Sequence, residues 1–326
     1  MILGLTHLIN IAFANILNNS LLNLIFHMFF LPFFVNKSYD FIFLPAANRR
    51  LMAFYPLHTI ATFHDLSQFN VVSKYDFFRM FYIKHIIPIF LKRIHVIIAV
   101  SYNTKLDLIK HFNIKKNKIH VNYNGVDQNL YVYKKNNFND LKRKLFLNKE
   151  YFLYVSRIEH PGKNHLNLIK AYELLPKEIK CKYDLVLVGT KREKAEIVLD
   201  YILKSEDRNS IKILGFVTNE ELPTVFSNAK LFVFPSLYEG FGIPLVEAMA
   251  MQVPTLCASN SSLLEIGKNV SKFFNEYSPL SIKNSLVEVL NDELLQKQMV
   301  NNGLIEIKKY DWSCHAKRII ALHRAR

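Results

Sequence analysis

Residues 234–250 (FPSLYEGFGIPLVEAMA) carry the residue types best suited to binding a phosphorylated ligand. An apolar run ends in a turn that contains Gly240 and Gly242, and Pro244 suits the first turn of the helix that we expect to follow. The two glycines allow the backbone to approach a ligand closely, and the free N–H groups of a helix start attract anions. The pattern therefore predicts a site for an anionic group such as a diphosphate.

Two glutamates accompany this turn. Glu239 lies in the expected loop, and Glu247 lies about two turns away along the expected helix. One carboxylate could hold sugar hydroxyls and the other a ribose, with the phosphates between them. Each could equally be an ordinary surface glutamate.

The elements that must position these residues are short apolar runs that alternate with helical stretches. In the second half of the chain, buried strands are expected at residues 151–155, 184–188, 211–214 and 231–234. Helices are expected to follow them at residues 164–175, 191–204, 219–228 and 243–250. This alternation predicts a parallel sheet with helices on both faces.

The first half repeats the pattern less clearly. Strands are expected at residues 39–45, 58–63 and 95–100, and helices at residues 76–92 and 103–112. Residues 121–137 then break the rhythm with Asn-Gly and a polar, lysine-containing stretch, so we place a domain junction there. Two doubly wound domains in tandem would bind a ligand in the cleft that faces the carboxyl ends of both sheets.

Length and composition agree with a folded chain of two domains. At roughly 150 residues per domain, 326 residues favour two. Half of the residues are apolar and 21% are charged, which disfavours a disordered chain. The three cysteines include no CxxC pair, so neither a disulfide framework nor a cysteine-rich zinc site is indicated, and a reducing cytosol fits best.

The net charge of +15 gathers in the first half of the chain. Residues 1–144 hold 18 basic against 6 acidic side chains, or +12, whereas residues 145–326 are close to neutral at +3. A phosphate-rich membrane, a lipid phosphate or nucleic acid could attract such a surface, and a solvated lysine-rich surface is the alternative. Nucleic acid is least favoured, because zinc, RNP-like and helix-turn-helix signatures are absent.

Residues 21–35 (LLNLIFHMFFLPFFV) form the most apolar stretch. It is shorter than the roughly 20 apolar residues of a spanning helix, and Asn23, His27 and Pro32 interrupt it. It also lacks the basic region and cleavage site of a secretory signal. We expect a core helix, with a helix lying on a membrane surface as the alternative.

Residues 234–250 resemble the E-x7-E signature of retaining glycosyltransferases of family 4. The similarity extends over most of the chain, to residues 62–66 (TFHDL), 98–101 (IAVS), 121–127 (VNYNGVD), 156–165 (SRIEHPGKNH) and 215–236 (GFVTNEELPTVFSNAKLFVFPS). The resemblance implies an α/β fold of the GT-B type, in which two Rossmann-like, doubly wound parallel-sheet domains face a cleft. It implies an acceptor-side domain over residues 1–130, a nucleotide-sugar domain over residues 131–310, and a C-terminal helix over residues 311–326 that crosses back to the first domain.

The resemblance also implies roles for residues of the second domain. Arg157 and Lys163 would bind the donor diphosphate, and the turn around Gly215 and Val217 would line the nucleotide base. The remaining donor-binding positions belong to the E-x7-E stretch: Glu239 at the transferred hexose, the backbone of Gly240, Phe241 and Gly242 at the diphosphate, and Glu247 at the ribose.

From the first domain, His64 would approach the reacting carbon and act with Glu239 as a catalytic residue. Asn48, Arg49 and Arg50 follow an expected strand and could contact the acceptor, although a surface pair of arginines is equally plausible. Two fixed cations and a helix terminus can stabilise the leaving diphosphate, so neither a metal nor another cofactor is expected.

One feature departs from the family pattern. Family members usually open with a strand and a loop of the GGIGRY kind, whereas residues 1–34 contain only Gly4, so the first domain is expected to be shortened at its N-terminus. The leading hypothesis is a cytoplasmic hexosyltransferase, peripheral on the inner face of the membrane, that acts in surface polysaccharide or glycolipid assembly. It would use a GDP- or UDP-hexose and a saccharide or lipid-linked acceptor. A truncated, non-catalytic nucleotide-sugar-binding subunit and a nucleotide-sugar epimerase are the alternatives.

Overall fold

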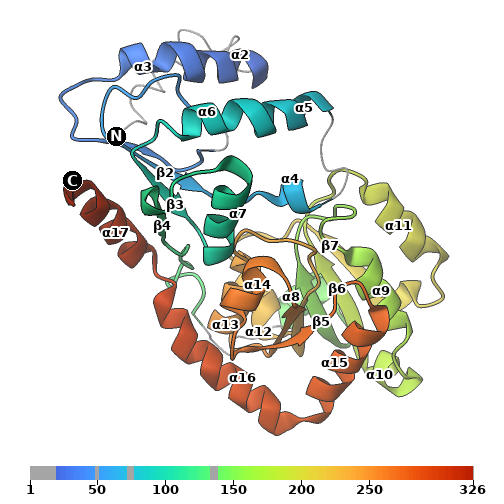
Figure 1. Cartoon of the computed structure of the whole chain (residues 1–326). Helices are drawn as coiled ribbons and strands as arrows, with labels where there is room; N and C mark the ends of the chain where they lie inside the picture. The colour runs from blue at the N-terminus through green and yellow to red at the C-terminus, as the bar shows by residue number, and fades with distance from the viewer. Residues whose placement is uncertain (1–19, 48–50, 72–76, 133–138, 326) are drawn as a thin grey trace.

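A computed structural model describes residues 20–47, 51–71, 77–132 and 139–325. Figure 1 shows two α/β units, each built around a parallel sheet with helices on its faces. The expected α/β class with two parallel-sheet units is confirmed, and among the described strands the order reverses in the second sheet but not in the first. The expected shortening of the first domain rests on residues 1–34, of which residues 1–19 lie outside the described residues.

The first sheet has four strands in the order β1-β2-β3-β4, all parallel. They are β1 Ile42–Leu44, β2 Thr59–Phe63, β3 Val96–Ala99 and β4 Ile119–Val121. Every residue of β2 is buried, as expected for a central strand covered on both faces. The helical elements of this unit are α2 Ser20–Ile25, η1 Phe26–Phe30, α3 Leu31–Phe34, α4 Ser67–Asn70, α5 Phe77–Phe81, η2 Tyr82–Ile86, α6 Ile87–Leu91, α7 Tyr102–Phe112 and η3 Lys116–Lys118.

The second sheet has six parallel strands in the order β10-β9-β8-β5-β6-β7. They are β5 Glu150–Val155, β6 Tyr183–Val188, β7 Ile211–Gly215, β8 Leu231–Phe234, β9 Thr255–Ala258 and β10 Ser271–Phe274. The helical elements of this part are α8 Asn139–Lys144, α9 His165–Glu173, α10 Lys177–Lys182, α11 Ala195–Lys204, η4 Arg208–Ser210, α12 Leu222–Ser227, α13 Ile243–Ala250, α14 Ser261–Ile266, α15 Pro279–Asn291, α16 Glu293–Glu306 and η5 Ile307–Lys309.

Large aromatic side chains fill the core of the second unit, and their hydroxyl groups are paired. Tyr151 donates to the carbonyl of Val225 at 2.7 Å, and Tyr154 donates to the carbonyl of Lys163 at 2.8 Å. Both tyrosines are almost completely buried. Because an unpaired buried hydroxyl is costly, these bonds fix the core and, through Lys163, the loop that follows β5.

The last helix, α17 Trp312–Arg324, lies against the first sheet rather than the second. Ile319 packs with Ile60 of β2 and Ile98 of β3. Near the start of α17, the imidazole Nδ1 of His315 lies 2.8 Å from the carbonyl oxygen of Tyr123. The end of the chain therefore ties the segment after β4 to the first unit.

Several sequence expectations need correction. Strands β4, β9 and β10 were not predicted, and the strand expected over residues 39–45 is reduced to β1. The interpretation of residues 21–35 as a core helix is wrong. The segment is helical over residues 20–34 and contains a π-helical turn, η1, but Phe33 is 74% exposed and its neighbour Phe34 is 55% exposed.

Candidate active site

Two neighbouring strands at the centre of the second sheet position the expected donor-binding residues. β5 and β8 pair in parallel, and the strand order reverses between them, with β6 and β7 on one side and β9 and β10 on the other. The loops over residues 156–164 and 235–242 follow these two strands. They therefore meet at the switch point, which is where open α/β sheets bind their ligands.

One charged side chain from each loop forms an ion pair at this point. Lys163 Nζ lies 2.6 Å from Glu239 Oε1, and the two side chains are only 17% and 15% exposed. Two charges that are largely withdrawn from water are costly unless they are paired, so each stabilises the other here. The pair places a cation that can bind a phosphate next to a carboxylate that can accept hydrogen bonds from sugar hydroxyls.

The backbone of the loop before α13 is held by serine side chains of α14. The hydroxyl of Ser262 donates to the carbonyl oxygens of Glu239 and Phe241, both at 2.9 Å. Gly242 precedes α13 with φ +104°, a conformation that side-chain-bearing residues rarely adopt. Pro244 has no N–H, and the N–H of Leu245 donates to the carbonyl of Gly242 at 3.0 Å, so Ile243 supplies the N–H that the first turn of α13 can offer to an anion.

Gly240 brings the loop into backbone contact with the first unit. A Cβ atom at Gly240 would lie 1.9 Å from the carbonyl oxygen of His64, so a larger residue would force the two units apart. The hydroxyls of Ser101 and Thr104 donate to the carbonyl oxygen of Gly240 at 2.7 and 3.2 Å. His64 follows β2 and Ser101 follows β3, so the carboxyl ends of strands from both sheets converge on this loop.

The imidazole of His64 is oriented by the first unit. Its Nε2 lies 2.7 Å from the carbonyl oxygen of Pro45, which follows β1. Because a carbonyl can only accept, Nε2 carries the proton and donates it to this bond, leaving Nδ1 as the acceptor in the neutral ring. His64 is therefore brought to the loop by its backbone, with its ring held in one orientation.

Arg157 and Lys163 occupy different environments. Arg157 Nη2 lies 3.2 Å from Glu159 Oε2, and the Arg157 side chain is 53% exposed. Lys163 is paired deep in the site, whereas Arg157 extends from its rim. The structure thus places one cation at the switch point and one closer to solvent.

Glu247 contacts the segment that joins the two units. Its carboxylate is hydrogen-bonded to the hydroxyl of Tyr131, and burial raises the pKa of Glu247 to about 6 although that bond lowers it. Burial and the Glu247 charge both raise the pKa of Tyr131, so the phenol stays protonated and donates. The two glutamates of the E-x7-E stretch therefore have different partners, Lys163 for Glu239 and Tyr131 for Glu247.

Three other expected donor-binding residues offer only backbone to a ligand. Gly215 ends β7 with φ +69°, and a Cβ there would meet no atom within 4 Å. The side chain of Val217 is buried, and that of Phe241 packs edge-on against the Tyr310 ring with centroids 5.6 Å apart. The three expected acceptor-side residues, Asn48, Arg49 and Arg50, lie outside the described residues.

Sequence reasoning missed a carboxylate that crosses between the two units. Glu265 of α14 accepts from the backbone N–H of Tyr102 at 3.0 and 2.9 Å and from that of Asn103 at 3.3 Å, at the start of α7. The hydroxyl of Tyr123 donates to the same carboxylate at 2.7 Å. A carboxylate at a helix N-terminus is favourable, because it pairs N–H groups that the helix leaves open and opposes the helix dipole.

A second missed contact lies beside the loop. The hydroxyl of Tyr238 donates to Asp107 Oδ2 and accepts from Asn103 Nδ2 at 3.1 Å. Burial and the charge of Asp107 raise the pKa of Tyr238, so the phenol remains protonated. The loop that carries Glu239 is therefore anchored to α7 from both of its sides.

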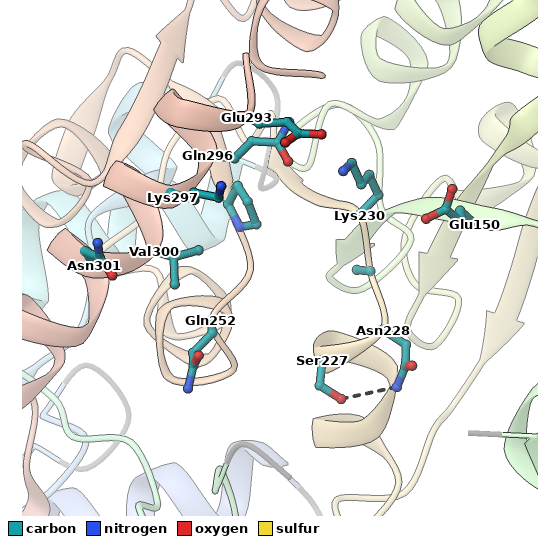
Figure 2. A pocket seen from close by; sticks show the side chains of 12 residues that line it. Glu150, Ser227, Asn228, Lys230, Gln252, Glu293, Gln296, Lys297, Val300 and Asn301 are labelled. Atoms are coloured by element: carbon teal, nitrogen blue, oxygen red, sulfur yellow. Dashed lines mark hydrogen bonds between the residues drawn. The ribbon is translucent and has the colours of Figure 1, made fainter. Parts of the chain in front are cut away.

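A cavity of about 690 Å³ lies elsewhere in the second unit. Its lining includes Glu150 at the start of β5, Lys230 just before β8, and Glu293 and Lys297 of α16. Figure 2 shows these side chains around a wide opening, with Ser227 and Asn228 hydrogen-bonded at its edge. The cavity faces the amino ends of β5 and β8, opposite to the end where Lys163 and Glu239 meet, so we do not assign it to the donor.

Two α/β units with parallel sheets that meet at the carboxyl ends of their strands define the GT-B class of glycosyltransferase folds. Residues 136–305 match the family described as "Glycosyl transferases group 1", and residues 11–130 match that described as "Glycosyltransferase Family 4". The chain belongs to the group 1 glycosyl transferases. The resemblance inferred from its motifs is confirmed.

Several relatives are described as bacterial mannosyltransferases. O-antigen chain mannosyltransferase B of Escherichia coli is 28% identical over 264 residues, which cover 80% of this chain and 69% of the relative. The serotype-specific mannosyltransferase WbdA of E. coli is 30% identical over 268 residues, 79% of this chain but only 32% of that protein. The chain thus matches about a third of WbdA.

Solved structures agree with the fold. Sucrose-phosphate synthase from Thermosynechococcus elongatus superposes with a TM-score of 0.74 at 19% identity, over 91% of this chain and 76% of that one. Anabaena Alr3699/HepE in complex with UDP gives a TM-score of 0.72 at 19% identity, over 89% and 79% of the two chains. At this identity the likeness establishes the GT-B fold alone.

Proposed function

We propose that this chain is a retaining hexosyltransferase that moves a hexose from a nucleotide sugar to a saccharide or lipid-linked acceptor. The observation that carries the proposal is the Lys163–Glu239 pair, held at 2.6 Å at the switch point of the second sheet and beside the start of α13. A cation, a carboxylate and the N–H of Ile243 at a helix start, gathered in one place, suit a sugar diphosphate.

In this proposal the second unit holds the donor. Lys163, Arg157 and the amides of residues 240–242 bind the diphosphate, while Glu239 accepts hydrogen bonds from the hexose and Glu247 from the ribose. Gly215 and Val217 contact the base through their backbone. Because fixed cations and helix amides stabilise the leaving diphosphate, the reaction needs no metal.

The transfer step places the acceptor on the side of the first unit. The acceptor oxygen bonds to the anomeric carbon as the bond from that carbon to the diphosphate oxygen breaks, and both events occur on the same face of the sugar. Because attack and departure share that face, the anomeric configuration is retained, and the acceptor proton passes to the leaving diphosphate. His64 positions the hexose by hydrogen bonding to one of its hydroxyls.

The named relatives favour mannose as the hexose and a surface polysaccharide as the product. Two of them are described as O-antigen or serotype-specific mannosyltransferases. We therefore place GDP-mannose first among the GDP- and UDP-hexoses, and an O-antigen type of chain first among the acceptors. We further propose residues 1–130 as the acceptor-side domain, residues 131–310 as the donor domain and residues 311–326 as the returning helix, with the protein peripheral on the inner face of an anionic membrane.

Thermal stabilisation by a panel of nucleotide sugars tests this proposal. A ligand that binds only the native protein raises the unfolding temperature as its concentration rises, and 100 times its Kd adds about 2.7 kcal/mol. We expect GDP-mannose to stabilise the protein and to be consumed when acceptor is added. Binding without turnover would favour the non-catalytic subunit, and a failure of every nucleotide sugar to stabilise the protein would overturn the proposal.

A further inference from the structure

An exposed row of phenylalanines marks the first helical segment of the described chain. α2, η1 and α3 run without a break over residues 20–34, and Phe29, Phe30, Phe33 and Phe34 are all between 48% and 74% exposed. The opposite side of the segment is anchored, because Met28 is buried and its carbonyl accepts from the N–H of Ala53 at 2.8 Å. The segment is therefore fixed to the molecule while its aromatic face is open.

A second helical segment repeats this arrangement. α5, η2 and α6 run over residues 77–91, with Phe77 at 77%, Phe78 at 83% and Phe81 at 52% exposed. Its other side enters the core of the first unit through Ile83 and Ile87. Of the ten exposed phenylalanines among the described residues, seven lie on these two segments.

The two segments share one end of the molecule. In Figure 1 they lie at the top of the view, on the side of the first sheet away from the second unit. Surface apolar residues are normal when scattered singly, but a contiguous patch marks a contact with a partner or a membrane. Because the two segments lie at this end, a partner or membrane that covers them would not block the loop at Gly240 or the start of α13.

The charged residues within the two segments are all basic. Neither segment contains an acidic residue, and exposed Arg79 and Lys84 lie within the second segment, with exposed Lys92 and Arg93 directly after it. Aromatic side chains fringed by arginine and lysine match the interface of an anionic bilayer, where rings enter the headgroup region and cations meet lipid phosphates. A second copy of the chain would oppose this positive fringe with an identical one, which disfavours self-association.

We propose that residues 20–34 and 77–91 form a membrane-docking face, called here the aromatic face, whose phenylalanines insert into the interface of an anionic bilayer. The proposal builds on the membrane association included in the proposed function, and it does not depend on the transfer reaction. No helix among the described residues is long and apolar enough to cross a bilayer. In this proposal the protein attaches by insertion of side chains from helices that lie on the bilayer surface.

Sedimentation with vesicles tests the aromatic face by direct comparison of variants. The full chain is mixed with vesicles of phosphatidylethanolamine and phosphatidylglycerol, or of phosphatidylcholine alone, at low and high salt. We expect the Phe77→Ser/Phe78→Ser protein to bind the anionic vesicles at least about tenfold more weakly than the parent, because two rings lose their apolar burial. Arg79→Gln/Lys84→Gln should lower binding to anionic vesicles and reduce its salt dependence.

A matched control is available in the second unit. Phe146 is 78% exposed, as much as the two tested rings, but precedes β5 and lies outside the aromatic face. Phe146→Ser should leave vesicle binding unchanged. Since all of these residues are exposed, unfolding temperatures and nucleotide-sugar affinity should also be unchanged, which separates the aromatic face from the donor site.

A spectroscopic readout reports insertion itself. The chain has a single tryptophan, Trp312, so Phe78→Trp adds one indole whose signal is obtained by difference. Brominated lipids should quench the added fluorescence in anionic vesicles. Three results would overturn the proposal. The first is parent-like vesicle binding by the Phe77→Ser/Phe78→Ser protein, and the second is an added indole that brominated lipids do not quench. The third is that this double variant loses self-association of the parent while its vesicle binding is unchanged. Absence of vesicle binding by the parent would overturn the membrane part of the proposed function as well, whereas donor binding would be unaffected.

Discussion

Substitution of the two partners of the Lys163–Glu239 pair should have opposite effects on the binding of a free nucleoside diphosphate. In the structure the Lys163 ammonium is engaged by the Glu239 carboxylate at 2.6 Å. A diphosphate must therefore compete with Glu239 for Lys163. Lys163→Met removes the cation but keeps an apolar stem, and Glu239→Gln removes the competing charge.

The size of each effect follows from the geometry. A hydrogen bond to a charged group contributes about 1.5 to 3 kcal/mol, so Lys163→Met should weaken binding of GDP or UDP by about 10- to 150-fold. The pair is neither exposed nor fully buried, at 17% and 15% side-chain exposure. Release of Lys163 from it should tighten diphosphate binding by about 1 kcal/mol, or roughly fivefold, in the Glu239→Gln protein.

Isothermal titration calorimetry with the free nucleoside diphosphate, GDP or UDP, and with the matching nucleotide sugar measures both effects. We expect Glu239→Gln to lose the extra affinity for the sugar while gaining affinity for the diphosphate, and the double variant to show non-additive energies. Lys180→Met is the control, because the Lys180–Asp207 pair has a similar length, 2.7 Å, and similar exposure, 20% and 22%, outside the site. Unchanged diphosphate affinity in Lys163→Met, or equal weakening by Lys163→Met and Glu239→Gln, would refute this reasoning.

Three further predictions concern Glu247, metal ions and Glu265. The pKa of Glu247 is raised from 4.5 to about 6, so ionisation of Glu247 lowers the free energy of unfolding by about 2 kcal/mol as pH rises through that window. Glu247→Gln should remove this loss, measured by denaturant titrations at pH 4 and 7, and should also weaken binding of the free nucleotide. An unchanged pH dependence of stability in the variant would contradict the prediction. Transfer should persist in excess EDTA, because cations and helix amides replace a divalent ion, and loss of activity that magnesium or manganese restores would count against the proposed mechanism. Glu265→Gln weakens the hydrogen bonds from Glu265 to the start of α7 in the other unit and should lower the free energy of unfolding by about 0.3 to 2 kcal/mol. Glu220→Gln, at an exposed position, should not, and equal unfolding temperatures for the two variants would argue against this role of Glu265.

Much of the fold could be predicted because its central strands are short, apolar and sharply bounded. β2 and β6 are buried along their whole length, so their sequences contain few polar residues to obscure the pattern. Two of the missed strands, β4 and β10, lacked this signal, whereas β9 is buried along its whole length and was missed nonetheless. β4 has three residues with the exposed His120 at its centre, and β10 begins with the half-exposed pair Ser271 and Lys272.

The candidate site likewise contains residues that the sequence could predict and residues that it could not. Lys163 and Glu239 lie in loops whose local sequence is distinctive, and the structure brings them together. Glu265 was missed because its partner at Tyr102 is 163 residues away in sequence, and nothing near either residue indicates that contact. Hydropathy alone also could not separate a core helix from a surface one, since Phe33 raises the apolar content equally whether it faces the core or solvent.

The central claim is that this chain transfers a hexose with retention from a nucleotide sugar held between its two units. NMR of the product formed from GDP-mannose and a saccharide acceptor tests this most directly, because the one-bond coupling between the anomeric carbon and its proton reports the configuration of a mannoside. The account predicts an α-linked mannose from the α-configured donor, with at least about tenfold slower product formation by the Lys163→Met protein at a donor concentration below the KM of the parent. A β-linked product, or full transfer by Lys163→Met, would contradict it.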